Sequence, residues 1–128
     1  MPKVKWLEKP EAQDFPAAAD YLALLADSRT VNDLIQSLQA GTIVHKKAKD
    51  ILRAAQLTLL PTDNPHVASD LAKIKNKEPL SPILVIRDDF SIGSPLQIAD
   101  GYHRVCASYY TDENTDIPVV IAAASRNK

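Results

Sequence analysis

The sequence predicts an α+β domain, with helices in its first half and strands alternating with a helix in its second. Up to about residue 75, apolar residues recur at helical spacing between prolines, whereas short apolar runs rich in β-branched residues follow residue 80. The chain has 128 residues, 45% of them hydrophobic and 24% charged, as expected of one globular domain. We expect a single compact domain with an N-terminal arm and helical extension over 1–58 and a core over 59–128.

Four helices are expected before residue 80, after a charged arm that Trp6 anchors to the body. Asn64 and Pro65 are typical of a helix start, and Gly41 is typical of a left-handed helix end. The first expected helix begins at Pro16. The other three run from Thr30 to Gly41, from about Val44 to Ala55, and from Pro65 to about Lys75.

The expected strands are short and apolar, and one helix lies among them. A turn rich in Asp, Ser, Gly and Pro over 88–95 separates two of them. The expected elements are a strand or extended stretch at 57–60, strands at 82–86, 96–99 and 117–121, and a helix from His103 to about Thr111.

Composition and charge exclude several classes of protein. A formal net charge of −1 excludes a uniformly basic nucleic-acid binder. The single cysteine, Cys106, excludes an internal disulfide framework and a Cys-rich zinc module, and its apolar neighbours predict packing in the core. The apolar runs are too short for a membrane span and the first residues are charged, which predicts a cytoplasmic protein without a membrane partner.

One constellation carries the residue types of a chemical site, at the junction of a predicted strand and helix. Gly101 allows close backbone approach to an anion, and His103 and Arg104 add donors beside the free N–H groups of the first helical turn. Asp100 would repel an anion directly, so its role there is that of a Mg²⁺ ligand or a general base.

The same turn is equally consistent with a structural role. An Asp before a helix is commonly an N-cap, and a Gly at a strand end is commonly a turn residue. In that interpretation Arg104 pairs with Asp100 and binds no ligand.

The stretches PILVIRDD, PLQIADGYHRVCAS and IPVVIA, in this order, resemble the ParB/sulfiredoxin superfamily. The resemblance covers about half the chain and implies a ParB/sulfiredoxin-like small mixed sheet, covered here by the helical extension. It also implies that the turn binds nucleotide phosphates. The residues that match this role are Gly101, Tyr102, His103 and Arg104, with His66 at the start of a neighbouring helix.

Departures from the superfamily patterns narrow the implied activity. Tyr102 stands where sulfiredoxins have their reactive cysteine, so that activity is not expected. This chain lacks the Glu and two of the arginines of the ParB-type CTPase pattern. The turn is similar to the Asp-Gly-x-His-Arg turn of free-serine kinases, in which the Asp has a metal or catalytic role. The catalytic Glu of those kinases has no counterpart here, so whether this chain is an enzyme stays open.

The leading hypothesis is therefore a nucleotide-binding protein, with Mg²⁺-dependent phosphotransfer or nucleotide hydrolysis as its activity. Mg²⁺ and a nucleoside triphosphate are the expected cofactors, and Asp100 is the expected metal ligand or catalytic base. The alternative is a non-enzymatic DNA-associated or protein-interaction module. Its basic face on the third helix comprises His45, Lys46, Lys47, Lys49 and Arg53. A scaffold whose turn binds nothing is the third hypothesis.

Overall fold

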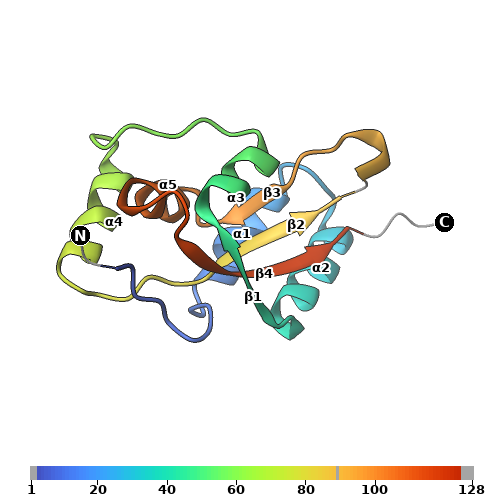
Figure 1. Cartoon of the computed structure of the whole chain (residues 1–128). Helices are drawn as coiled ribbons and strands as arrows, with labels where there is room; N and C mark the ends of the chain where they lie inside the picture. The colour runs from blue at the N-terminus through green and yellow to red at the C-terminus, as the bar shows by residue number, and fades with distance from the viewer. Residues whose placement is uncertain (1–2, 89, 125–128) are drawn as a thin grey trace.

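The computed structural model describes residues 3–88 and 90–124 of the chain (Figure 1). They form five α-helices and one four-stranded mixed sheet, which confirms the α+β class. The helices are α1 (Asp14–Leu22), α2 (Ser28–Ala40), α3 (Ala48–Ala55), α4 (Pro65–Lys75) and α5 (Tyr102–Thr111). The strands are β1 (Ile43–Lys47), β2 (Ile83–Arg87), β3 (Gln97–Asp100) and β4 (Asp116–Ala123), and the 3-10 turn η1 (Phe90–Ile92) joins β2 to β3.

The sheet has the strand order β1-β4-β2-β3. The central pair, β2 and β4, is parallel, with Leu84 opposite Val120, and both outer pairs are antiparallel. The chain returns from β3 to β4 through α5, as a parallel connection requires. The predicted strand–turn–strand–helix–strand order of the second half is therefore confirmed.

Helices cover both faces of the sheet (Figure 1). Ile83 and Val85 of β2 belong to a core cluster shared with α3, α4 and α5. Leu84 and Ile86 belong to a second cluster shared with α1 and α2. Because β2 is buried on both faces, its apolar residues are continuous and do not alternate with polar ones. Helices α1 to α3 thus pack on the sheet, while residues 43–47 of the same N-terminal part form one of its strands.

Capping residues explain where two helices begin. The Asn64 side chain accepts hydrogen bonds from the N–H groups of His66 at 3.0 Å and Val67 at 3.2 Å, and Pro65 occupies the first turn. This confirms the predicted start of α4. The Asp27 side chain caps α2 by accepting a hydrogen bond from the Thr30 N–H. This helix therefore begins slightly earlier than expected.

The predicted third helix is wrong in its first turn, because residues 43–47 form β1. Ile43 to Lys47 pair with Val120 to Asp116 of β4, and α3 begins only at Ala48. Only Ile43 in this strand is even half-buried, so the sequence lacks the apolar alternation typical of a strand. Pairing with β4, a contact distant in sequence, decides the conformation.

The predicted strand or extended stretch at 57–60 is extended but belongs to no strand. The Tyr102 hydroxyl donates to the Thr58 carbonyl, and the Tyr110 hydroxyl donates to the Leu60 carbonyl at 2.7 Å. Leu60 packs against the core. Tyrosine hydroxyls therefore satisfy carbonyls that a neighbouring strand would otherwise bind.

The N-terminal arm docks on the segment that leads into β2. The Leu7 N–H donates to the Leu80 carbonyl, the Leu80 N–H donates to the Lys5 carbonyl, and both distances are 2.8 Å. Trp6 is half-buried against the core, as predicted. None of the helices in the described part of the chain combines the length and apolar character that crossing a bilayer requires.

Candidate functional site

The turn between β3 and α5 presents an uncapped helix start. Gly101 lies just before the helix with φ +115°, and no side chain among the described residues bonds to the N–H groups of the first turn. These N–H groups also have no partner within the helix, and the helix dipole places partial positive charge there. The local backbone therefore favours an anion at this position.

A polar cleft of about 280 Å³ lies at this helix start, between α4 and α5, which pack side by side (Figure 1). Apart from Gly101, every residue that lines it has a polar side chain. Those from α4 are His66, Ser69, Asp70 and Lys73, and those from the turn and α5 are Asp100, Gly101, His103 and Arg104. The structure thus brings His66 together with the DGYHR turn, except for Tyr102, which does not line the cleft.

Two histidines from different helices meet in this cleft. The ring centroids of His66 and His103 are 4.7 Å apart. Burial lowers the pKa of His103 below 6.5, and the neighbouring His66 lowers it further, while Asp70 and Arg104 have smaller and opposing effects. The lowered pKa favours the neutral form of His103 at pH 7, and a bound anion would favour its protonated form.

Arg104 is held by protein groups. Its Nη2 atom lies 2.7 Å from the Asp100 carboxylate and 3.3 Å from the Pro82 carbonyl, and its Nη1 atom lies 4.0 Å from the Asp14 carboxylate. Only 17% of its side chain is exposed. This is the pairing that the structural interpretation of the turn predicts: Nη2 is engaged by two protein acceptors, and Nη1 is directed toward a second carboxylate.

Asp14 extends this network to the first helix. It is 5% exposed and accepts hydrogen bonds from the Ser81 hydroxyl and from the Glu11 N–H, the latter at 2.9 Å. Arg104 therefore lies between two carboxylates, from α1 and from the end of β3. The guanidinium offsets the cost of burying them.

Asp100 is a poor fit for the expected Mg²⁺ site. A cationic guanidinium already occupies its carboxylate at 2.7 Å. Within residues 3–88 and 90–124, no group of three His, Cys, Asp or Glu side chains is arranged to hold a metal ion. Burial raises the pKa of Asp100, although Arg104 opposes this rise. The geometry assigns Asp100 to holding Arg104.

Two further residues of the α5 segment have structural positions. The Tyr102 hydroxyl bonds to the Thr58 carbonyl, while its ring stacks on His103 with centroids 5.8 Å apart. Cys106 is fully buried in the core, as predicted, and burial raises the pKa of its thiol. A protonated, buried thiol is a poor nucleophile.

Five residues of this region were not predicted from the sequence. Ser69, Asp70 and Lys73 follow His66 at helical spacing, so the polar face of α4 was a usable signal once His66 was placed near the turn. Asp14 and Ser81 carry no such signal, because only the folded chain brings them to Arg104.

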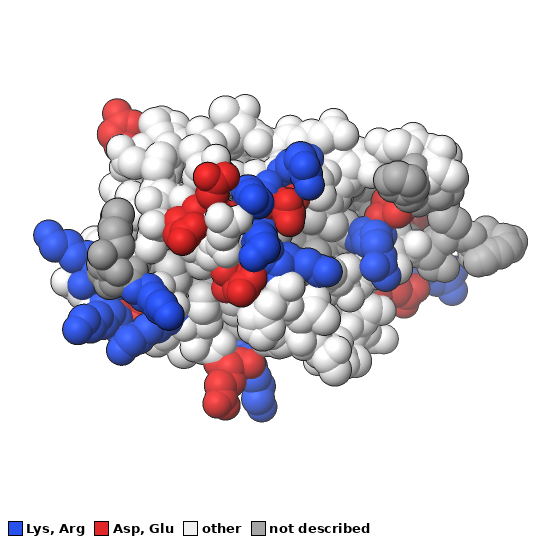
Figure 2. All heavy atoms as spheres, in the orientation of Figure 1, with Lys and Arg blue, Asp and Glu red and all other residues white. Residues whose placement is uncertain are grey.

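The expected basic face is mixed in charge. His45, Lys46 and Lys47 lie on β1 and not on the helix. Lys47 lies 3.9 Å from Asp116, and Arg53 lies 3.1 Å from Asp50. Figure 2 shows acidic and basic side chains interleaved over this face. Acidic neighbours repel phosphates, so the surface does not favour the nucleic-acid alternative.

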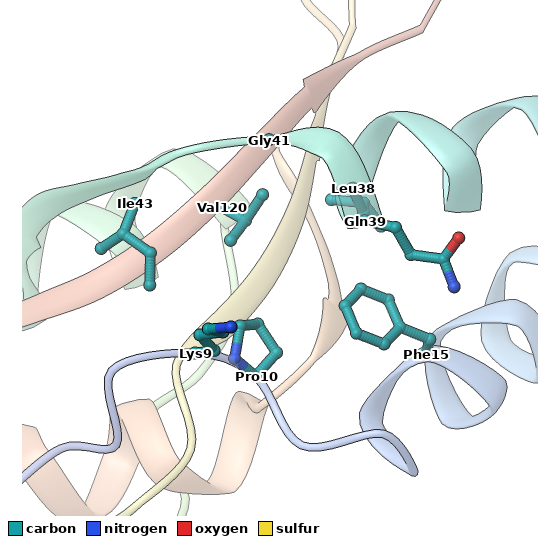
Figure 3. A pocket seen from close by; sticks show the side chains of 8 residues that line it. All are labelled: Lys9, Pro10, Phe15, Leu38, Gln39, Gly41, Ile43 and Val120. Carbon is teal, nitrogen blue, oxygen red and sulfur yellow. The ribbon is translucent and has the colours of Figure 1, made fainter.

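A second pocket, of about 200 Å³, lies between the arm, α1 and the end of α2 (Figure 3). Gly41 lines it beside Val120, and a Cβ atom at Gly41 would come within 2.6 Å of that side chain. The predicted left-handed conformation of Gly41 is wrong, since its φ is −75° and its ψ is 160°. The glycine is needed there for close packing where α2 passes into β1.

In comparisons with known proteins, the chain matches no family model, no curated protein and no solved structure.

Proposed function

We propose that the cleft between α4 and α5 binds the phosphate group of a nucleotide or another small phosphorylated compound. The proposal rests on the fact that several groups able to bind phosphate meet at this cleft. The uncapped N–H groups of α5, the histidine pair and the Lys73 ammonium all border one polar cleft. Backbone N–H groups at a helix start, together with cationic side chains, are typical phosphate ligands.

Lys73 is the cation best suited to the ligand. It is exposed at the cleft and takes part in none of the ion pairs among the described residues, whereas Arg104 is held by two carboxylates. His103 adds a second donor that gains charge on protonation. The resemblance of the Gly101-x-His103-Arg104 turn to the ParB/sulfiredoxin superfamily also supports the proposal. No metal-dependent step follows from this geometry.

A thermal-shift panel of ATP, ADP, CTP, GTP and inorganic phosphate, with and without Mg²⁺, tests the proposal. A ligand at about 100 times its Kd should add roughly 2.7 kcal/mol of stability, which is several degrees for a domain of this size. We expect Lys73→Ala to weaken binding about tenfold, because it removes a charge-assisted hydrogen bond. Lys75→Ala is the matched control, since this exposed lysine of α4 does not line the cleft. No shift at millimolar concentrations would reject the proposal.

Affinity for sulfate should rise as the pH falls. Sulfate keeps its charge over this range, so the change reports the protein. Because the pKa of His103 is lowered, its ring is neutral at high pH and gains charge only in acid. We expect affinity to increase about tenfold between about pH 8 and about pH 5.5, measured by NMR titration. His103→Asn should reduce this rise, leaving the part that comes from neutralisation of Asp70, whose pKa burial raises, whereas His45→Asn, on exposed β1, should not change it. An undiminished rise in His103→Asn would contradict this role.

A further inference from the structure

Asp70 is an unexplained carboxylate in the candidate cleft. It lies on α4 among the lining residues and is half-buried. Among the described residues, no hydrogen-bonding group or ion-pair partner engages it. Its surroundings are nonetheless polar, with Lys73, His66, His103 and Arg104 near enough to act on it electrostatically.

A free carboxylate conflicts with a bare phosphate. Two anions in one cleft repel each other, and burial already raises the pKa of Asp70, which shows the cost of its charge. The conflict disappears if the ligand itself brings a hydrogen-bond donor to the carboxylate. A hydroxyl is such a donor, and a carboxylate accepts only.

The cleft offers little surface for a nucleobase. Among the described residues that line it, none has an apolar side chain or is a Phe, Tyr or Trp, and its two aromatic rings, those of His66 and His103, lie against each other. The nearest tyrosine, Tyr102, lies outside the lining, with its hydroxyl bound to Thr58 and its ring stacked on His103. Bases are normally held by aromatic or apolar side chains, so recognition here falls on the phosphate and on hydroxyl groups.

We propose that the ligand is a phosphorylated polyhydroxy compound, whose phosphate meets Lys73 and the start of α5 and whose hydroxyl donates to Asp70. This proposal rests on the phosphate-binding function proposed above. It makes Asp70 a specificity residue, which selects among phosphates by requiring a hydroxyl group.

The test is a calorimetric comparison of inorganic phosphate, phenyl phosphate, ribose 5-phosphate and AMP on the wild-type protein. We expect ribose 5-phosphate to bind about tenfold more tightly than phenyl phosphate, because only the sugar offers a donor for a charge-assisted hydrogen bond. AMP should bind within about threefold of ribose 5-phosphate, since no Phe, Tyr or Trp side chain among the described lining residues can stack on the base.

The variant Asp70→Ala should change affinities in opposite directions. Inorganic phosphate should bind at least about threefold more tightly, because a repelling charge is gone, while the preference for ribose 5-phosphate over phenyl phosphate should vanish. Asp63→Ala is the matched control, because this exposed carboxylate precedes α4 and does not line the cleft.

The outcomes separate the two proposals. If the wild type binds phosphates without preferring the hydroxylated one, or if Asp70→Ala keeps the preference, the role of Asp70 is rejected and phosphate binding stands. If AMP binds about tenfold more tightly than ribose 5-phosphate, the base is recognised as well, and the proposal that only the phosphate and hydroxyl groups are recognised is rejected. If neither protein binds any phosphate, the proposed function fails and this inference fails with it.

Discussion

Replacing Arg104 by Ala should lower the free energy of unfolding by about 3–5 kcal/mol, which is the cost of leaving buried carboxylates without their cation. Asp14 and Asp100 have side chains only 7% and 16% exposed, and the guanidinium lies between them. Without it, the two carboxylates would face each other in a poorly solvated place, and the Pro82 carbonyl would lose a donor.

Urea unfolding followed by circular dichroism measures this loss. Arg53→Ala is the matched control, because that side chain is 84% exposed in its pair with Asp50 and should contribute no more than about 0.5 kcal/mol. Adding Asp100→Asn to Arg104→Ala should restore part of the stability, since one buried charge is removed. A loss below about 1 kcal/mol in Arg104→Ala would show that the network is not what stabilises the turn.

The role of Arg104 in stability makes it a poor position for testing ligand binding. Because Arg104 holds the turn together, lost ligand binding in Arg104→Ala would not show that the arginine touches the ligand. Lys73 and His103 are better positions, since the structure gives them no comparable set of partners.

Gly101→Ala should cost about 2–4 kcal/mol, for two reasons that add. A φ of +115° lies in a region that side chains with a Cβ atom rarely adopt. The added Cβ atom would also lie 2.4 Å from Ile83 Cδ1, inside the core, and 3.0 Å from Arg104 Nη2. The substitution would therefore disturb both β2 and the arginine network.

Gly93→Ala separates the two reasons. Gly93 also has a positive φ, of +73°, but no atom outside its chain neighbours lies within 4 Å of its ideal Cβ position. It should cost only the backbone term, about 1 kcal/mol. Equal losses for both variants, measured by urea unfolding, would contradict the steric argument at Gly101.

Elements with local determinants were predictable from the sequence. Asn64 and Pro65 mark the start of α4 through a cap that involves only neighbouring residues. The apolar run of β2 is continuous because helices cover both faces of the sheet. In contrast, β1 is exposed along most of its length, so only its pairing with β4 defines it, and that contact lies far away in the sequence.

In the candidate site too, residues close together in the sequence were predictable, and contacts between distant segments were not. Gly101 and His103 lie within one short motif, and the helix cap that starts α4 places His66 near them. The partners of Arg104 could not be foreseen completely. Asp100 was an obvious neighbour, whereas Asp14 reaches it from the first helix. A sequence pattern therefore located the turn but could not decide whether its arginine was free.

The position of β4 between β1 and β2 has a consequence for synthesis of the chain. Of the four strands that the structure describes, β4 is one of the two central ones and the last in sequence, and β1 pairs with it alone. Until residues 116–123 leave the ribosome, β1 and β2 each expose an unpaired edge, and such edges favour aggregation. We expect the nascent chain to complete its sheet only after these residues emerge.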